Sequence, residues 1–206
     1  YSTHSTNSDY SNISPVTQNQ MRDYLKHLLL PCPSILDSAL QLSEREAVTS
    51  TVATLNNWTG YYPFYFQVND LPFDEWEQLL QDNKTGYLPV CRVTTPYRSY
   101  DALIYSIQWS PSKYFYACQD ISTIRGMVIA EQNLSHYHLT IEDIDGTCLY
   151  SEIVDSNIEY YSVSQDTNSG GLTFTVHVPK SMLASQMKPL YAFLIAYLLI
   201  YLSILA

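Results

Sequence analysis

The chain has 206 residues, which is enough for one domain of ordinary size with short extensions. Apolar residues make up 46% of it and charged residues only 15%, which excludes a disordered chain and a coiled coil. Acidic residues outnumber basic residues by 20 to 10, and the formal net charge of −10 disfavours binding to the phosphates of nucleic acids.

The N-terminal quarter of the chain is expected to be helical. Residues 1–15 are rich in Ser, Thr and Asn without an apolar period, and we expect them to form a flexible arm. Apolar residues recur at helical spacing over 21–28 and again over 35–48, where Ser34 is a candidate N-cap. The sequence therefore predicts a helical segment over 16–57. A further helix is predicted from Pro72 to about Asp82, since Asp74 and Glu75 suit the positive end of a helix.

The rest of the chain, over 58–180, is expected to be mainly β. Short runs of β-favouring residues recur roughly every 8–12 residues between turn-forming residues. Strands are predicted near 61–66, 88–94, 102–109, 113–118, 125–132, 136–142, 147–154, 157–164 and 171–178. The expected fold class is α+β, mainly β: an antiparallel β-sandwich or partly open barrel with an N-terminal helical segment and a C-terminal hydrophobic (transmembrane) helix.

The C-terminal tail predicts contact with a membrane. Residues 190–206 contain no charge, Gly or Pro, and about 1.5 Å per residue gives roughly 25 Å of helix, slightly less than a ~30 Å hydrocarbon core. A retained anchor over 189–206 is favoured, with a GPI-addition signal or a buried core helix as alternatives. The residues expected to face lipid or a neighbouring helix are Leu190, Tyr191, Ala196, Tyr197 and Tyr201.

Several patterns are typical of a protein that crosses the secretory pathway. The first residue is Tyr, and we expect a signal peptide to have preceded it. Four N-x-[ST] sequons occur where about two are expected by chance, and the predicted glycosylation sites are Asn12, Asn57, Asn83 and Asn133. Residues 16–188 are therefore expected to form an extracellular domain.

Four cysteines favour two disulfides. None of their spacings matches a C-x-x-C motif, and the even count suits an oxidising compartment, with four buried thiols as the alternative. Of the three possible connectivities we prefer Cys91 with Cys118 and Cys32 with Cys148.

Tyrosine, with 19 copies, is the unusual residue of this composition. It combines a large contact area with a hydrogen-bonding tip and suits recognition surfaces, although strands also favour it for packing. Adjacent tyrosines on a strand point to opposite faces, so the candidate recognition residues are Tyr61, Tyr62, Tyr160 and Tyr161.

Motifs for catalysis are weak. The chain has no G-x-S-x-G motif and no Gly-rich phosphate loop, and residues 141–152 match a calcium loop only in part. We expect no enzyme activity and no cofactor. The alternative is a metal-dependent enzyme in which His136 and His138, on one face of a strand, bind zinc or copper with Glu142 or Asp143.

These observations together predict a membrane-anchored, disulfide-bonded surface glycoprotein. It would act by protein or glycan recognition as a subunit of a membrane-associated complex, and its partners would be other membrane or extracellular proteins. Residues 190–206 would contact the lipid bilayer, and no nucleic acid would be bound. Its place would be the cell surface or another membrane of the secretory pathway.

Overall fold

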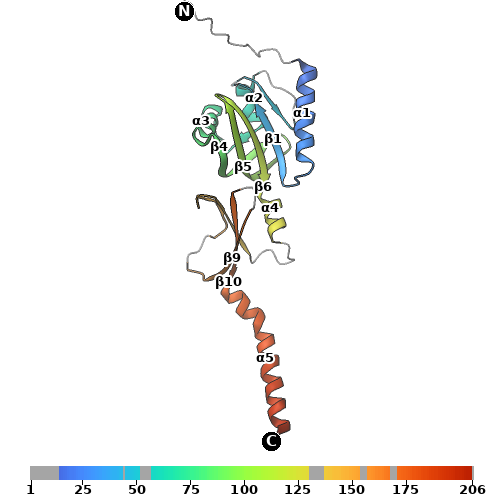
Figure 1. Ribbon diagram of the computed structural model, residues 1–206, viewed down its shortest axis with the longest axis vertical. Coiled ribbons are helices and arrows are strands. Elements are labelled where there is room, and N and C mark those ends of the chain that lie inside the picture. The colour runs from blue at the N-terminus through green and yellow to red at the C-terminus, as the bar shows by residue number, and fades with distance from the viewer. Residues whose placement is uncertain are drawn as a thin grey trace, which may run out of the picture. The chain divides into compact units, whose positions relative to one another are not determined.

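The computed structural model describes residues 14–43, 45–51, 57–129, 137–153, 157–167 and 171–205, which fall into two compact units (Figure 1). Unit 1 ends at Ile124 and unit 2 begins at Arg125.

Unit 1 is built around an antiparallel sheet of six strands in the order β2-β1-β6-β5-β4-β3. Three helices accompany the sheet, and α4 (Ile121–Val128) follows its last strand. The elements in chain order are α1 (Pro15–Leu29), β1 (Ile35–Gln41), β2 (Ala47–Thr49), α2 (Trp58–Tyr65), β3 (Gln67–Val68), α3 (Phe73–Asn83), β4 (Thr85–Thr95), β5 (Arg98–Ser110) and β6 (Lys113–Asp120).

Unit 2 contains an antiparallel sheet of four strands in the order β8-β7-β10-β9. Its elements are β7 (His138–Asp143), β8 (Cys148–Ser151), β9 (Tyr160–Asp166), β10 (Leu172–Pro179) and α5 (Lys180–Leu205). Helix α5 continues directly from β10 and extends away from this sheet (Figure 1).

Helices lie against the sheet of unit 1. Helix α1 contacts β1 and β2, whereas α2 contacts α3 and β4, and α3 contacts β4 and β5. We call the face of the sheet that packs on α2 and α3 the inner face. It holds the main core, which consists of Trp58, Tyr62, Phe66, Phe73, Trp76 and Leu80 packed on Ala39, Leu88, Val93, Ile104, Tyr114 and Tyr116.

The predicted helices over 21–28 and 72–82 are confirmed as α1 and α3. Ser14 caps α1, accepting a hydrogen bond from the Thr17 amide at 3.2 Å, and Pro15 occupies the first turn, where its missing N–H has no consequence. In α3, Phe73, Trp76 and Leu80 are buried at i, i+3 and i+7, so one face packs on the sheet while the other stays polar.

Three predicted elements are wrong, each because tertiary contacts override local spacing. Residues 35–48 form β1 and β2 instead of a helix: β1 pairs on both sides, and the consecutive residues Asp37, Ser38 and Ala39 are all buried, so the strand shows no alternation. Residues 61–66 lie mostly in α2, because a helix places Trp58 and Tyr62 together in the core. Residues 125–128 belong to α4.

The mainly β, α+β class is confirmed, in the form of curled antiparallel sheet. The strands expected to build a single sandwich are divided between two sheets, one in each unit. The remaining predicted strands over 88–178 correspond to β4–β10.

The tail adopts the predicted helical conformation, as the second half of the 26-residue helix α5. Its described side chains end at Tyr197, so that of Tyr201 lies outside the described residues. Within the described part of the chain, no helix is both long enough and apolar enough to cross a membrane.

Candidate functional site

The inner face of unit 1 is lined by aromatic rings that contact one another. The Tyr62 and Trp76 rings are stacked with centroids 6.5 Å apart, and the Phe66 and Tyr116 rings lie 5.2 Å apart. Trp58, Tyr62, Trp76 and Tyr116 have no exposed surface. Such packed aromatic walls are typical of sites that enclose small molecules as well as of ordinary cores.

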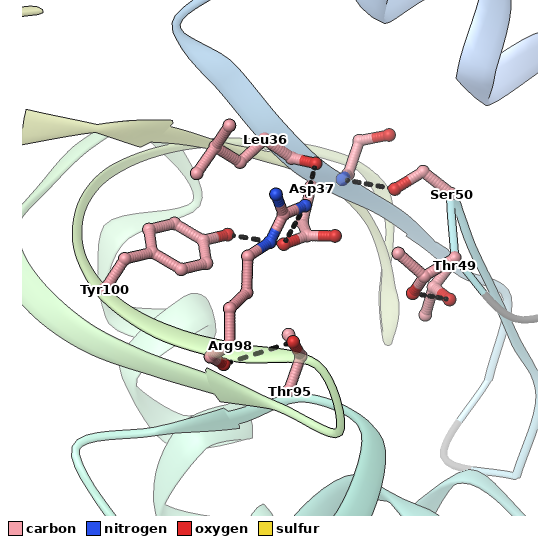
Figure 2. A network of polar contacts seen from close by, with 9 residues as sticks. Leu36, Asp37, Thr49, Ser50, Thr95, Arg98 and Tyr100 are labelled. Atoms are coloured by element: carbon pink, nitrogen blue, oxygen red, sulfur yellow. Dashed lines mark hydrogen bonds and ion pairs between the residues drawn. The ribbon is translucent and has the colours of Figure 1, made fainter. Parts of the chain in front are cut away.

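A buried carboxylate lies at one end of this face (Figure 2). The Tyr100 hydroxyl donates a hydrogen bond to Asp37 Oδ2 at 2.7 Å, and Arg98 Nη2 lies 3.2 Å from the same oxygen. Arg98 Nη2 also donates to the Leu36 carbonyl at 2.8 Å. The Asp37 side chain is 3% exposed and that of Arg98 is 40% exposed, so the ion pair connects the interior to the surface.

Several buried polar atoms on the inner face have no hydrogen-bond partner among the described residues. They are Asp37 Oδ1, Gln41 Oε1, Trp58 Nε1, Trp76 Nε1, Ser106 Oγ and Tyr116 OH. Trp76 lies close enough to the Tyr116 hydroxyl to lower its pKa, but these two atoms do not reach ordinary hydrogen-bond geometry. A buried polar atom without a partner is destabilising, so these atoms need hydrogen bonds from bound water or a ligand.

The phenols and thiols of this face stay protonated at neutral pH. Burial raises the pKa of Tyr62, Tyr100 and Tyr116 well above the ordinary value of a tyrosine. Burial likewise raises the pKa of the Cys91 and Cys118 thiols. The inner face therefore presents neutral hydroxyl and indole donors together with one carboxylate.

A second polar cluster lies on the sheet of unit 2. His177 on β10 is directly opposite His138 on β7, and the Tyr160 ring packs edge-on against both imidazoles. His177 Nδ1 shares a hydrogen bond with Ser162 Oγ at 2.7 Å, and its Nε2 shares one with Thr140 Oγ1 at 3.0 Å. Burial lowers the pKa of His177 most, and the nearby His138 lowers it further, so the neutral form of His177 is favoured.

The predicted metal site is only partly described. His138 lies in β7, but His136 lies outside the described residues. Among the residues that the structure describes, no three His, Cys, Asp or Glu side chains are grouped to hold a metal ion.

The four predicted recognition tyrosines differ in exposure. The prediction that Tyr62 is a surface contact is wrong, because its side chain is fully buried. Its hydroxyl accepts a hydrogen bond from the backbone N–H of Val68 at 3.0 Å. Tyr61 is 42% exposed, and Tyr161 is 55% exposed with Lys180 Nζ 5.4 Å from its ring centroid. Tyr160 is half-buried against the two histidines. A surface role for Tyr61 and Tyr161 stays a prediction.

All four cysteines are free thiols in the structure. The Cys91–Cys118 bond is a wrong prediction, because β5 runs between their strands: Cys91 is opposite Ala102, and Cys118 is opposite Ile104. Two strand spacings amount to about 10 Å, beyond the roughly 7 Å that a disulfide spans between Cα atoms. Cys32 and Cys148 are exposed and belong to different units, and a bond between them stays a prediction.

Two of the four predicted glycosylation sites are described. Asn57 is exposed and precedes α2. The side-chain amide of Asn83 donates a hydrogen bond to the backbone carbonyl of Leu79 at 2.8 Å. Asn12 and Asn133 lie outside the described residues.

No local sequence pattern marks Asp37, Arg98 or Tyr100 as members of one site. Asp37 is separated from the other two by more than 60 positions, and its segment was expected to be helical. Only the pairing of β1, β6 and β5 brings the three side chains together.

No protein-family model matches the chain, and no curated protein matches it. Solved structures do resemble it. The extracellular domain of soHK1S-Z6, described as a histidine kinase, aligns with a TM-score of 0.52 at 11% identity, covering 84% of this chain and 80% of that one. This likeness shows a shared fold.

Weaker likenesses connect the chain to two further solved structures. The extracellular domain of rpHK1S-Z16, also described as a histidine kinase, gives a TM-score of 0.44 at 13% identity over 84% of this chain and 80% of that one. The ligand-binding domain of Mlp24 with asparagine gives 0.38 at 13% identity over 85% and 80%.

Proposed function

We propose that this chain is the extracellular sensor domain of a membrane receptor and that it binds a small molecule on the inner face of unit 1. The observation that carries the proposal is the set of buried, unpartnered polar atoms on that face, led by Asp37 Oδ1. A ligand with donors and acceptors would satisfy these atoms. The fold shared with the extracellular domain of soHK1S-Z6 supports the same proposal.

The proposed role is recognition without catalysis. The inner face holds one carboxylate already paired with Arg98 and Tyr100, and its thiols are buried and protonated. We find in this face neither an activated nucleophile nor a free general base among the described residues.

Binding can be tested with the full chain in detergent and the twenty amino acids as probes. Each probe is added at about 1 mM, which is the dissociation constant of a weakly bound small ligand. Differential scanning calorimetry should show that at least one probe raises the unfolding temperature of unit 1 in a saturable way. Asp37→Asn should abolish the shift, whereas the control Asp101→Asn, which alters an exposed carboxylate paired with Arg92, should retain it. Equal shifts in both variants would place the ligand elsewhere.

We further propose that residues 190–206 anchor the chain in a membrane. The described apolar side chains of α5 are exposed in a continuous series that water solvates poorly, namely Leu190, Tyr191, Phe193, Leu194, Ile195 and Tyr197. Deletion of 190–206 should release a soluble protein with the same cooperative unfolding. A full chain that is monomeric in buffer without detergent would contradict the anchor. Glycosylation, a Cys32–Cys148 bond and membership of a membrane complex remain parts of this proposal.

A further inference from the structure

A concave site lies in unit 1, away from Asp37. It is an open groove of about 420 Å³ between the C-terminal end of α3 and the β5–β6 hairpin. Its volume falls within the roughly 300–1,000 Å³ of small-ligand pockets. Gln108, in its wall, lies eight residues beyond Tyr100 on the same strand, so at ~3.3 Å per residue the two positions are about 26 Å apart.

The groove is lined mainly by neutral polar groups. Three carboxamides line it, those of Gln78, Gln81 and Gln108, and the two charged side chains, Asp82 and Lys84, have opposite signs. Each carboxamide offers both hydrogen-bond donors and an acceptor. A ligand that matches this lining is uncharged and carries many groups that can both donate and accept.

The groove walls are held together before any ligand binds. The backbone N–H of Gln108 donates a hydrogen bond to the backbone carbonyl of Lys84 at 2.8 Å, which connects β5 to the end of α3. The Gln108 side-chain amide donates to the Tyr114 hydroxyl at 3.0 Å, and that of Gln78 donates to Asp82 Oδ1 at 2.8 Å. These bonds orient two of the three carboxamides, which lowers the conformational entropy that these side chains lose when a ligand binds.

Two residues of the groove have strained backbones. Lys84 has φ 44° and Ser112 has φ 58°, in the left-handed region that disfavours residues with a Cβ. Residues held in such conformations cluster at ligand sites, where the surrounding structure fixes them. Both lie at the groove, one on each wall.

We propose that this groove binds a neutral saccharide of one or two rings, through the carboxamides of Gln78, Gln81 and Gln108. Sugar hydroxyls each donate and accept, as the carboxamides do, and a neutral ring leaves the Asp82 and Lys84 charges balanced. The site is distinct from the inner-face site proposed above, and neither proposal depends on the other.

The experiment is a titration of the ¹⁵N-labelled full chain with maltose and glucose, in a detergent without a sugar headgroup. The side-chain NH₂ signals of Gln81 and Gln108 should shift in a saturable way, and their assignment comes from Gln→Ala variants. Q108L and Q81L should each weaken binding about fivefold, the loss expected for one hydrogen bond of ~1 kcal/mol. The control Q165L changes an exposed glutamine of β9 and should leave the affinity unaltered.

Three outcomes would overturn the proposal. They are no saturable shift with either sugar, equal affinity in Q108L and Q165L, and a response to the zwitterion glycine in place of the sugars. Because Asp37→Asn should leave sugar binding intact, a failure of the inner-face site is distinguishable from a failure of the groove. If Q108L disturbs the fold, Q81L decides the result, since Gln81 is exposed and its side chain makes no hydrogen bond to another described residue of the groove walls.

Discussion

The hydroxyl of Tyr100 is expected to stabilise unit 1 because it serves a buried carboxylate. In Tyr100→Phe, Asp37 Oδ2 loses its 2.7 Å hydrogen bond and keeps only Arg98, while Oδ1 has no partner among the described residues. A hydrogen bond to a charged group contributes about 1.5–3 kcal/mol. The Arg98 side chain is 40% exposed, so solvent screens its compensation. We expect the free energy of unfolding to fall by about 2 kcal/mol.

Urea unfolding followed by tryptophan fluorescence measures this change in unit 1 alone, because Trp58, Trp76 and Trp109 all lie there. With a slope of ~2 kcal/mol per molar urea, the midpoint should move down by about 1 M. Tyr105→Phe is the matched control on the same strand: the Tyr105 ring packs on Tyr87, and its hydroxyl has no hydrogen bond among the described residues.

The control should change stability by less than ~0.5 kcal/mol. The loss in Tyr100→Phe should also shrink when Asp37 is already replaced by Asn, since the acceptor of the Tyr100 hydrogen bond is then neutral. Equal losses in the Tyr100 and Tyr105 variants would refute the assignment of Tyr100 to the carboxylate.

Three further outcomes follow from burial and charge. Trp76→Ala should cost about 3–5 kcal/mol because the ring is fully buried, whereas Trp109→Ala, with the side chain 48% exposed, should cost far less in the same urea assay. Ellman's reagent should label Cys91 and Cys118 only after unfolding, whether or not Cys32 and Cys148 are bonded to each other; prompt labelling of Cys91 or Cys118 in the native chain would contradict their burial. Because burial and His138 lower the pKa of His177, the unfolded chain binds its proton more readily, so unit 2 should lose stability as pH falls below about 6.5. Hydrogen exchange of β10 between pH 8 and 5 should show this loss, absent in His177→Gln and kept in the exposed His27→Gln control.

Local sequence determined the elements whose signals agree with their packing. Ser14 and Pro15 define the start of α1, and the spacing of Phe73, Trp76 and Leu80 defines the buried side of α3. Alternation along residues 172–178 similarly predicted β10. In α3 one face packs on the core while the other stays polar, and along β10 apolar and polar residues alternate, so the period of the sequence reports the conformation.

Only the tertiary structure decided the conformation of segments that are covered on more than one side. β1 carries helix-like spacing but pairs with both β2 and β6, and backbone pairing with two neighbours outweighs a weak local preference. The same pairing decided the candidate site. Asp37 is more than 60 positions from Arg98 and Tyr100, and no local pattern records which strands become neighbours. Cys91 and Cys118 were misassigned for that reason, since the separation of two cysteines depends on the strand that lies between them.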